Sequence, residues 1–158
     1  MTRITQFTLF SQAWQNFRDF LNDNLTDPVT GIKSSTRKWV YNKEPKPGNN
    51  FHGLPFIQVS DLTITDSIKS FGLGKQIHLL KAIVTIKTKD KENTGDSPQL
   101  DTISDELNYA VKTQTSLADN GIQDVMIDDC GVDDTEYAGA AARIRTFGVT
   151  ASVVLHYG

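Results

Sequence analysis

Cysteine is almost absent from this chain of 158 residues, because Cys130 stands alone. A single cysteine excludes an internal disulfide and fits a reducing compartment such as the cytoplasm. Long apolar runs are missing too, and no stretch approaches the roughly 20 residues that span a bilayer. The first residues also lack an uninterrupted apolar core. We therefore expect neither a signal peptide nor a membrane anchor.

An excess of positive charge is also missing, since the formal net charge is -3 and the isoelectric point is about 5.5. This balance argues against a dedicated DNA-binding protein. The charge is nevertheless segregated: residues 31–91 hold eleven Lys and Arg against four acids, whereas residues 101–136 hold ten acids and one lysine. Attraction between unlike parts of two copies favours head-to-tail assembly, which can close into a ring. Two ordinary solvated surfaces are the alternative interpretation.

Two segments have the apolar periodicity of amphipathic helices. Residues 7–25 repeat apolar, mostly aromatic side chains at spacings of three and four, and Pro28 follows the end of the pattern. We expect this stripe to cover a sheet, with docking on a partner as the alternative. A second helix is predicted to begin at Pro98 and to run to about Leu117, with Tyr109 included in its apolar stripe.

The remaining patterns are those of strands. We predict a long hairpin with an exposed tip at 66–74 and a bulge near Ser60 and Asp61. The expected strands are 36–41, 56–65, 75–88, 122–128 and 143–157. Together they predict a single α+β domain over residues 1–158, with a mainly antiparallel sheet covered by two helices. The loop at 42–55 is unusually long, which is typical of functional or disordered segments.

The acidic stretch 128–136 is the strongest candidate for a metal site. A calcium loop of the EF-hand kind fails here, because the first ligand position before Gly131 would be Met126 and no flanking helix pair is predicted. A looser site for a hard cation stays open, since several carboxylates can converge on a turn. The alternative is a solvated connection between two strands.

No other residue pattern predicts chemistry. The histidines at 52, 78 and 156 lie far apart in the sequence, and none has a second ligand at zinc-binding spacing. Nothing near Cys130 supports a nucleophile with its base. The segment 72–75 lacks the full spacing of a phosphate loop and precedes a strand, so a hairpin turn explains it better. We predict no catalytic residue, no metal site and no cofactor, and hence a protein that is not an enzyme.

The order of elements is helix, short strand, long hairpin, polar loop, helix and two strands. This order resembles that of the tail terminator (tail completion) proteins of long-tailed bacteriophages, over residues 5–157. The residues that carry the resemblance are Leu54–Val59, Ile77–Lys87, the helix from Pro98, and Val149–Val154.

The resemblance implies a fold like that of tail-tube subunits and a structural, non-enzymatic role in the virion. Such proteins form a hexameric ring, cap the head-proximal end of the tube, stop its polymerisation and supply the head-tail joining surface. The expected partners are further copies of the chain, the tail tube protein and a head-completion or neck protein, with DNA only passing through the lumen. Assembly would occur in the host cytoplasm. Another neck ring component (a connector or stopper) and a small metal-dependent enzyme using the carboxylates at 128–136 are the alternatives.

Charge segregation yields a hypothesis about the subunit interface of such a ring. We expect lysines of the hairpin and its flanking loop to face acids of the neighbouring copy. The lysines are Lys69, Lys75, Lys81, Lys87 and Lys89, and the acids are Asp128, Asp129, Asp133, Asp134 and Glu136. Acids not used in this way would line the lumen, where negative charge lets DNA pass without sticking.

Overall fold

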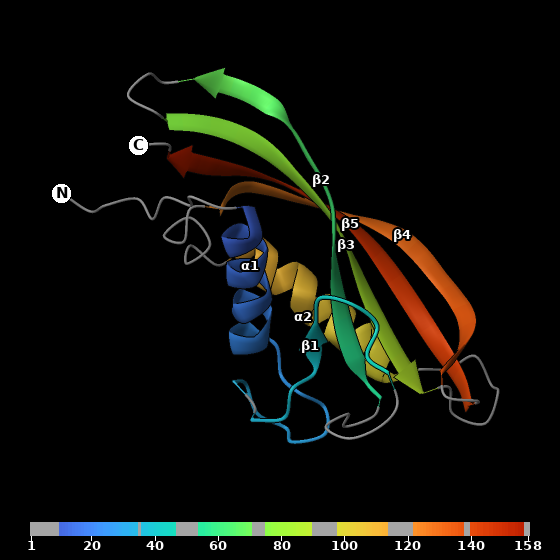
Figure 1. Ribbon diagram of the computed structural model, residues 1–158. Helices are drawn as coiled ribbons and strands as arrows, with labels where there is room; N and C mark the ends of the chain where they lie inside the picture. Colours follow the sequence, from blue (N-terminus) through green and yellow to red (C-terminus); the bar gives the residue numbers. More distant parts are fainter. Residues whose placement is uncertain are drawn as a thin grey trace.

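Five strands form one twisted sheet, and two helices cover one of its faces (Figure 1). The computed structural model describes residues 10–34, 36–46, 54–70, 75–89, 98–113, 122–137 and 140–156. In chain order the elements are α1 (Phe10–Asn24), β1 (Val40–Tyr41), β2 (Phe56–Ser70), β3 (Lys75–Lys89), α2 (Pro98–Thr113), β4 (Ile122–Tyr137) and β5 (Ala140–His156). The combination is an α+β architecture, which confirms the predicted class.

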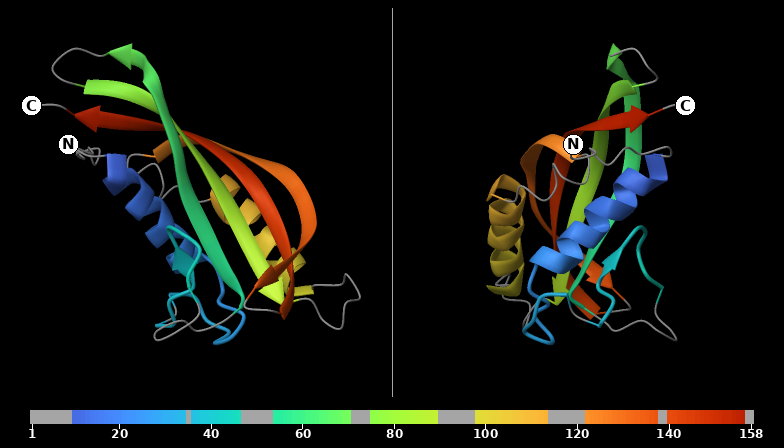
Figure 2. Two further views of the ribbon diagram at one scale, coloured as in Figure 1. Left: turned by 45° about the vertical axis from the view of Figure 1, so that its right-hand side comes forward. Right: turned by 90° about the vertical axis from the view of Figure 1, so that its left-hand side faces the viewer.

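The strand order in the sheet is β1-β2-β3-β5-β4. β1 is parallel to β2, and the other neighbouring pairs are antiparallel, so the sheet is mainly antiparallel as predicted. β2 and β3 form the predicted hairpin, and their register shifts between Asp61 and Thr63, beside the predicted bulge. β3 therefore lies in the middle of the sheet, whereas β4 forms one edge. The end of β2, the start of β3 and the end of β5 lie together and extend beyond both helices (Figure 2).

Both helices bury their apolar stripes against the same face of the sheet, which we call the inner face. The stripe of α1 is buried as the aromatic periodicity predicts, and alternate residues of the strands face it. The core residues of α1 and α2 include Trp14, Phe17, Phe20, Leu21, Leu100, Ile103 and Leu107, and those of the strands include Ile57, Val59, Val84, Ile86, Phe147 and Val149. Residues 7–9 and 114–117 of the predicted helices lie outside the described residues.

Tyr109 does not belong to the buried stripe of α2, since 68% of it is exposed. Its helical neighbours at i−4 and i+3 are Asp105 and Lys112, both exposed, so the 3.6-residue period places the three side chains on the solvent face. The prediction was wrong at this position because the neighbouring Ala110 and Val111 are apolar and buried, which widened the predicted stripe.

The acidic stretch 128–136 is the second half of strand β4, not a connection between strands as predicted. Most of its residues are exposed, so the alternation of apolar and polar residues that marks a half-buried strand is missing. Pairing with β5 stabilises it instead: Asp134 lies opposite Arg143, and unlike charges across two strands favour pairing. A register shift between Asp129 and Val132 marks a bulge around Gly131, whose φ of 102° favours glycine.

Other strand bounds also differ from the predictions, including that of β5, which begins at Ala140 rather than at residue 143. β2 runs to Ser70, so residues 66–70 belong to the strand rather than to the hairpin tip. β1 spans two residues, Val40 and Tyr41, whereas the prediction began at residue 36. Residues 71–74 of the tip and 47–53 of the predicted long loop lie outside the described residues.

A buried ion pair fixes the chain between α1 and β1. Arg37 donates to both carboxylate oxygens of Asp27, at 2.8 and 2.7 Å, and to the Pro55 carbonyl oxygen at 3.1 Å. Asp27 is fully buried and also accepts the backbone N–H of Val29 at 3.0 Å. Bidentate geometry and additional hydrogen bonds offset the desolvation of the two charges. The pair therefore determines the path by which the chain enters β1.

Candidate interface: an acidic edge and a basic patch

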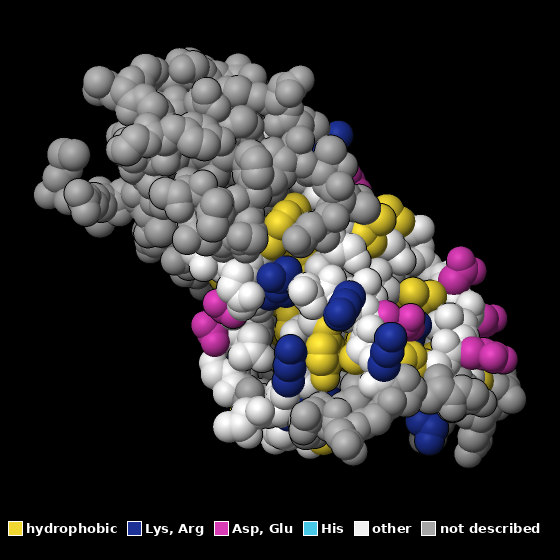
Figure 3. Space-filling view, viewed as in Figure 1, with side chains coloured by type: hydrophobic (Ala, Val, Ile, Leu, Met, Phe, Trp, Pro, Cys, Tyr) yellow, Lys and Arg dark blue, Asp and Glu magenta, His cyan; other side chains and the backbone are white. Residues whose placement is uncertain are grey.

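The exposed edge of the sheet carries negative charge. We call the five acids of β4 the acidic edge: Asp128, Asp129, Asp133, Asp134 and Glu136. All five are exposed, and Figure 3 shows acidic side chains along the right-hand side of the molecule. An edge strand also has backbone groups that are not used in its own sheet, so this edge combines charge with free pairing capacity.

Two of the five acids are paired with arginines of the neighbouring strand. Asp134 forms an ion pair with Arg143, and Asp129 forms one with Arg145. The hydrogen bond from Arg145 and that from the Gly131 N–H hold the pKa of Asp129 below its ordinary value, and Asp129 in turn raises the pKa of Arg145. Both pairings neutralise part of the edge.

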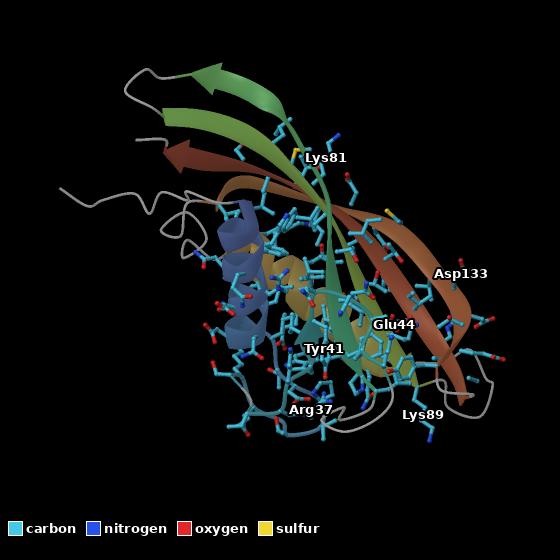
Figure 4. All side chains as sticks on the ribbon, in the orientation of Figure 1. Arg37, Tyr41, Glu44, Lys81, Lys89 and Asp133 are labelled. Carbon is cyan, nitrogen blue, oxygen red and sulfur yellow. The ribbon has the colours of Figure 1, made fainter. Side chains whose placement is uncertain are left out.

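The other three acids of the acidic edge differ from Asp129 and Asp134. Within the described part of the chain, Asp128, Asp133 and Glu136 form no ion pair. Asp133 lies on β4, at the opposite edge of the sheet from Tyr41 of β1 (Figure 4). A partner with positive charge can therefore approach these carboxylates without breaking an existing contact.

Positive charge gathers around β1. We call four exposed lysines, which precede or follow this strand along the chain, the basic patch: Lys33, Lys38, Lys43 and Lys46. Among the described residues none of the four forms an ion pair, and Lys38 lies over the ring of Tyr41 at 5.1 Å. Figure 3 shows lysine and arginine side chains on the lower half of the face opposite the helices, which we call the outer face. The basic patch and the acidic edge thus belong to the two opposite edges of the sheet, β1 and β4.

A polar hollow borders the basic patch. Its volume is about 360 Å³, and it opens between α1 and the chain around β1. The residues that line it are Gln15, Arg18, Asp19, Asn22, Thr36, Arg37, Lys38, Val40 and Asn42. Hydrogen bonds from Gln15 to Asp19 at 2.8 Å and from Arg18 to Gln15 at 3.3 Å order the helix side of the hollow. The basic patch therefore has a concave, polar border.

The segment of residues 42–46, which we call the strap, lies against the outer face of the sheet. The right-hand view of Figure 2 shows the strap on one side of the sheet and α2 on the other. Glu44 of the strap pairs with Lys87 of β3 at 2.6 Å, and the Tyr137 hydroxyl at the end of β4 donates to the Pro45 carbonyl oxygen. Burial raises the pKa of Tyr137, and the negative charge of Glu44 raises it further.

The hairpin lysines predicted for the interface have different surroundings. Lys81 and Lys89 are exposed, Lys81 near the middle of β3 and Lys89 at its end (Figure 4), so they stay predicted interface residues. Lys69 and Lys75 lie in β2 and β3, but their side chains are outside the described part of the structure. Because β3 is a central strand, none of the lysines on it lies at a sheet edge.

Lys87 is a correction to the predicted interface. It is 7% exposed, and its ammonium group is paired with Glu44 of the same chain. A lysine with its charge satisfied inside its own fold is not available to a neighbouring copy. The alternation along β3 puts Lys87 on the face opposite to that of the buried Val84 and Ile86, but it gives no sign that the strap covers this end of the strand.

No protein-family model matches this chain, and no curated protein sequence matches it significantly.

The described residues contain no group of three or more His, Cys, Asp or Glu side chains placed to hold a metal ion. No helix within these residues is long and apolar enough to cross a membrane. Cys130 is a free thiol on the exposed part of β4.

Sequence reasoning missed the basic patch and the strap. The lysines of the patch were part of the basic half of the chain, but no local pattern distinguished them from the hairpin lysines. One signal was present: the proline-rich segment after Tyr41 holds Glu44 among lysines, and an acid in such a setting is a candidate for a specific contact. The partner, Lys87, is separated from Glu44 by 43 residues.

Proposed function

We propose that this protein is a structural component of a bacteriophage tail, which assembles with copies of itself into a ring at the head-proximal end of the tail tube. There it stops polymerisation of the tube and forms the joining surface for the head. The observation that supports this function best is the separation of unpaired charge: four lysines of the basic patch lie apart from three carboxylates of the acidic edge. The role at the tail end rests on the order of elements in the sequence.

Separated charges of opposite sign favour a contact between unlike surfaces of two copies. Such a contact repeats, and it closes into a ring when the rotation between neighbours allows it. Each exposed pair contributes only about 0.2–1 kcal/mol, so the charges set register and orientation more than affinity. Backbone pairing at the free edge of β4 is a further source of affinity.

The experiment measures particle mass and shape for the purified chain. We expect closed rings by electron microscopy at low ionic strength, and dissociation as salt approaches half molar, where exposed charges are screened. Addition of the tail tube protein should yield capped tubes of limited length. A connector or stopper ring would assemble equally but leave tube length unchanged. A monomer at all protein and salt concentrations would contradict the proposal.

Two double variants separate charge placement from net charge. Reversing two acids of β4 (Asp128→Lys with Asp133→Lys) should weaken association, because it places lysines opposite the basic patch of the neighbour. Reversing two exposed acids of α1 (Asp19→Lys with Asp23→Lys) changes the net charge equally but adds positive charge beside the basic patch, so association should persist. Equal behaviour of both variants would show that placement is irrelevant.

A further inference from the structure

The strap is held by side chains that are far from it in the sequence. Lys87 lies in the central strand β3, and its ammonium group approaches Glu44 to 2.6 Å. Tyr137 is the last residue of β4, and its hydroxyl donates a hydrogen bond to Pro45. The two anchors therefore attach consecutive residues of the strap to two different strands.

A small second core lies beneath the strap, on the outer face of the sheet. Phe56 is fully buried there. The centroid of its ring lies 5.2 Å from that of Tyr137, with an angle of 65° between the ring planes, and 6.0 Å from that of Tyr41, with an angle of 88°. The Lys87 ammonium group lies 5.7 Å from the Phe56 ring and 5.4 Å from the Tyr137 ring. Aromatic faces attract a cation, and this attraction grows when water is excluded. Lys87 thus lies against the rings of Phe56 and Tyr137, which we call the aromatic seat, and Glu44 pairs with its ammonium group.

A lysine is a costly residue to bury at this position. Its charge must be compensated, and the compensating carboxylate comes from the strap, where 53% of the Glu44 side chain is exposed. An apolar side chain would fill the same seat without needing Glu44. When the residue is lysine, its buried charge is compensated only while the strap stays in place. Lys87 therefore holds the strap against the small core on the outer face.

The anchored residues lie between two lysines of the basic patch. Lys43 precedes Glu44, and Lys46 follows Pro45. Fixing Glu44 and Pro45 therefore restricts both lysines, each of which is one residue away from an anchor. Groups held in their bound arrangement lose less conformational freedom when a partner binds, which increases affinity.

We propose that Lys87 and Tyr137 are positioning residues of the subunit interface: they hold the strap so that Lys43 and Lys46 meet the acidic edge of a second copy of this chain. This inference rests on the proposed function. The geometry of the strap, in addition to the charge it carries, then determines how tightly two copies associate.

Glu44→Gln separates geometry from charge, because the two predict opposite changes. Removing one negative charge makes the basic side more positive, so charge alone predicts tighter association with an acidic partner. The glutamine side chain can still accept from Lys87, but a neutral amide oxygen binds the ammonium group more weakly than a carboxylate and leaves its charge uncompensated. The hold on the strap therefore weakens, and we expect association to weaken about two- to tenfold. Asp23→Asn is the matched control, since it removes one exposed charge on α1 and leaves both anchors intact.

Tyr137→Phe tests the second anchor without any change of charge. The ring stays in the aromatic seat and only the hydroxyl donor to Pro45 is lost, so the fold should persist while association weakens about two- to tenfold. Tyr109→Phe is its control, because that hydroxyl lies on the exposed face of α2. We expect this control to associate like the wild type.

Hydrogen exchange on monomers at high salt provides the readout of the strap itself. In both anchor variants, amides of residues 42–46 should exchange faster, while those of α1 and β5 keep their protection. Wild-type association in either variant despite faster exchange would overturn the inference, and so would unchanged exchange in the strap. A wild-type chain that never associates would overturn the proposed function and this inference with it.

Discussion

The acidic edge and the basic patch carry opposite charges, and they are built in different ways. The acidic edge is a long strand whose residues are placed by the hydrogen-bonded ladder with β5. The basic patch surrounds a strand of two residues, and its chain is placed by side chains from other elements. Asp27 with Arg37 fixes the entry to β1, and Glu44 with Lys87 fixes the strap after it.

The two surfaces should therefore differ in how sensitive they are to single substitutions. A strand tolerates the loss of one side-chain pair, because the backbone ladder and the remaining pairs still hold its register. A segment held by a few buried contacts loses its position when one of them is removed. Single substitutions should therefore disturb the basic patch more than the acidic edge.

The same substitution, Asp→Ala, tests this difference at both places and has the largest expected effect. Asp27→Ala leaves the Arg37 guanidinium buried without its carboxylate, so the free energy of unfolding should fall by about 3–5 kcal/mol. Asp134→Ala removes an exposed partner of Arg143, and the loss should stay below about 1 kcal/mol. Denaturant unfolding followed by circular dichroism measures both, and equal losses would remove the distinction between the two regions.

Mixing two reversed chains sharpens the comparison at the level of assembly. A chain with lysines at Asp128, Asp133 and Glu136 has two basic surfaces, and a chain with glutamates at the four lysines of the basic patch has two acidic ones. Alone, each should associate more weakly than the wild type, by about 0.6–3 kcal/mol per contact if three exposed pairs are lost.

The mixture of these two chains should recover association, because alternating copies place unlike charges at every contact. An alternating ring needs an even number of subunits, which native mass spectrometry can read directly. Recovery in rings with an odd number of subunits, or no recovery at all, would show that the basic patch and the acidic edge are not partners.

The smallest expected effect concerns pH and the acidic edge. The hydrogen bonds from Arg145 and the Gly131 N–H lower the pKa of Asp129 from its ordinary value of 3.8. This group therefore contributes its full stabilisation of the fold at any pH above the pKa that it has in the unfolded chain. The contribution is lost as the pH falls through the folded value. Asp129→Asn should therefore cost less than about 1 kcal/mol at neutral pH, since the pair is partly exposed.

As the pH falls through the folded pKa of Asp129, the difference in unfolding free energy between wild type and Asp129→Asn should shrink, because the protonated carboxyl group is then uncharged like the amide. Asp128→Asn is the control, since Asp128 has no ion pair among the described residues. A difference for Asp129→Asn that stays constant with pH would show that its charge has no stabilising role.

Much of the fold could be predicted from local sequence patterns. The aromatic periodicity of α1, the proline at the start of α2 and the alternating residues of β3 and β5 each follow from the geometry of a single element. The acidic half of β4 could not be predicted in this way. Its residues are exposed on both faces, and only the partner arginines at 143 and 145 show why it is a strand.

The sequence by itself determined the class of the fold, the segregation of charge and the acids that could form an interface. These properties depend on composition and on short periods, which act between residues close in the chain. The tertiary structure alone decided which charges stay free. Lys87 and Lys81 have the same parity on β3, yet one is buried beneath the strap and the other is exposed. The physical reason is that burial and ion pairing depend on contacts between distant residues, such as Glu44 with Lys87 and Pro45 with Tyr137, which no local pattern specifies.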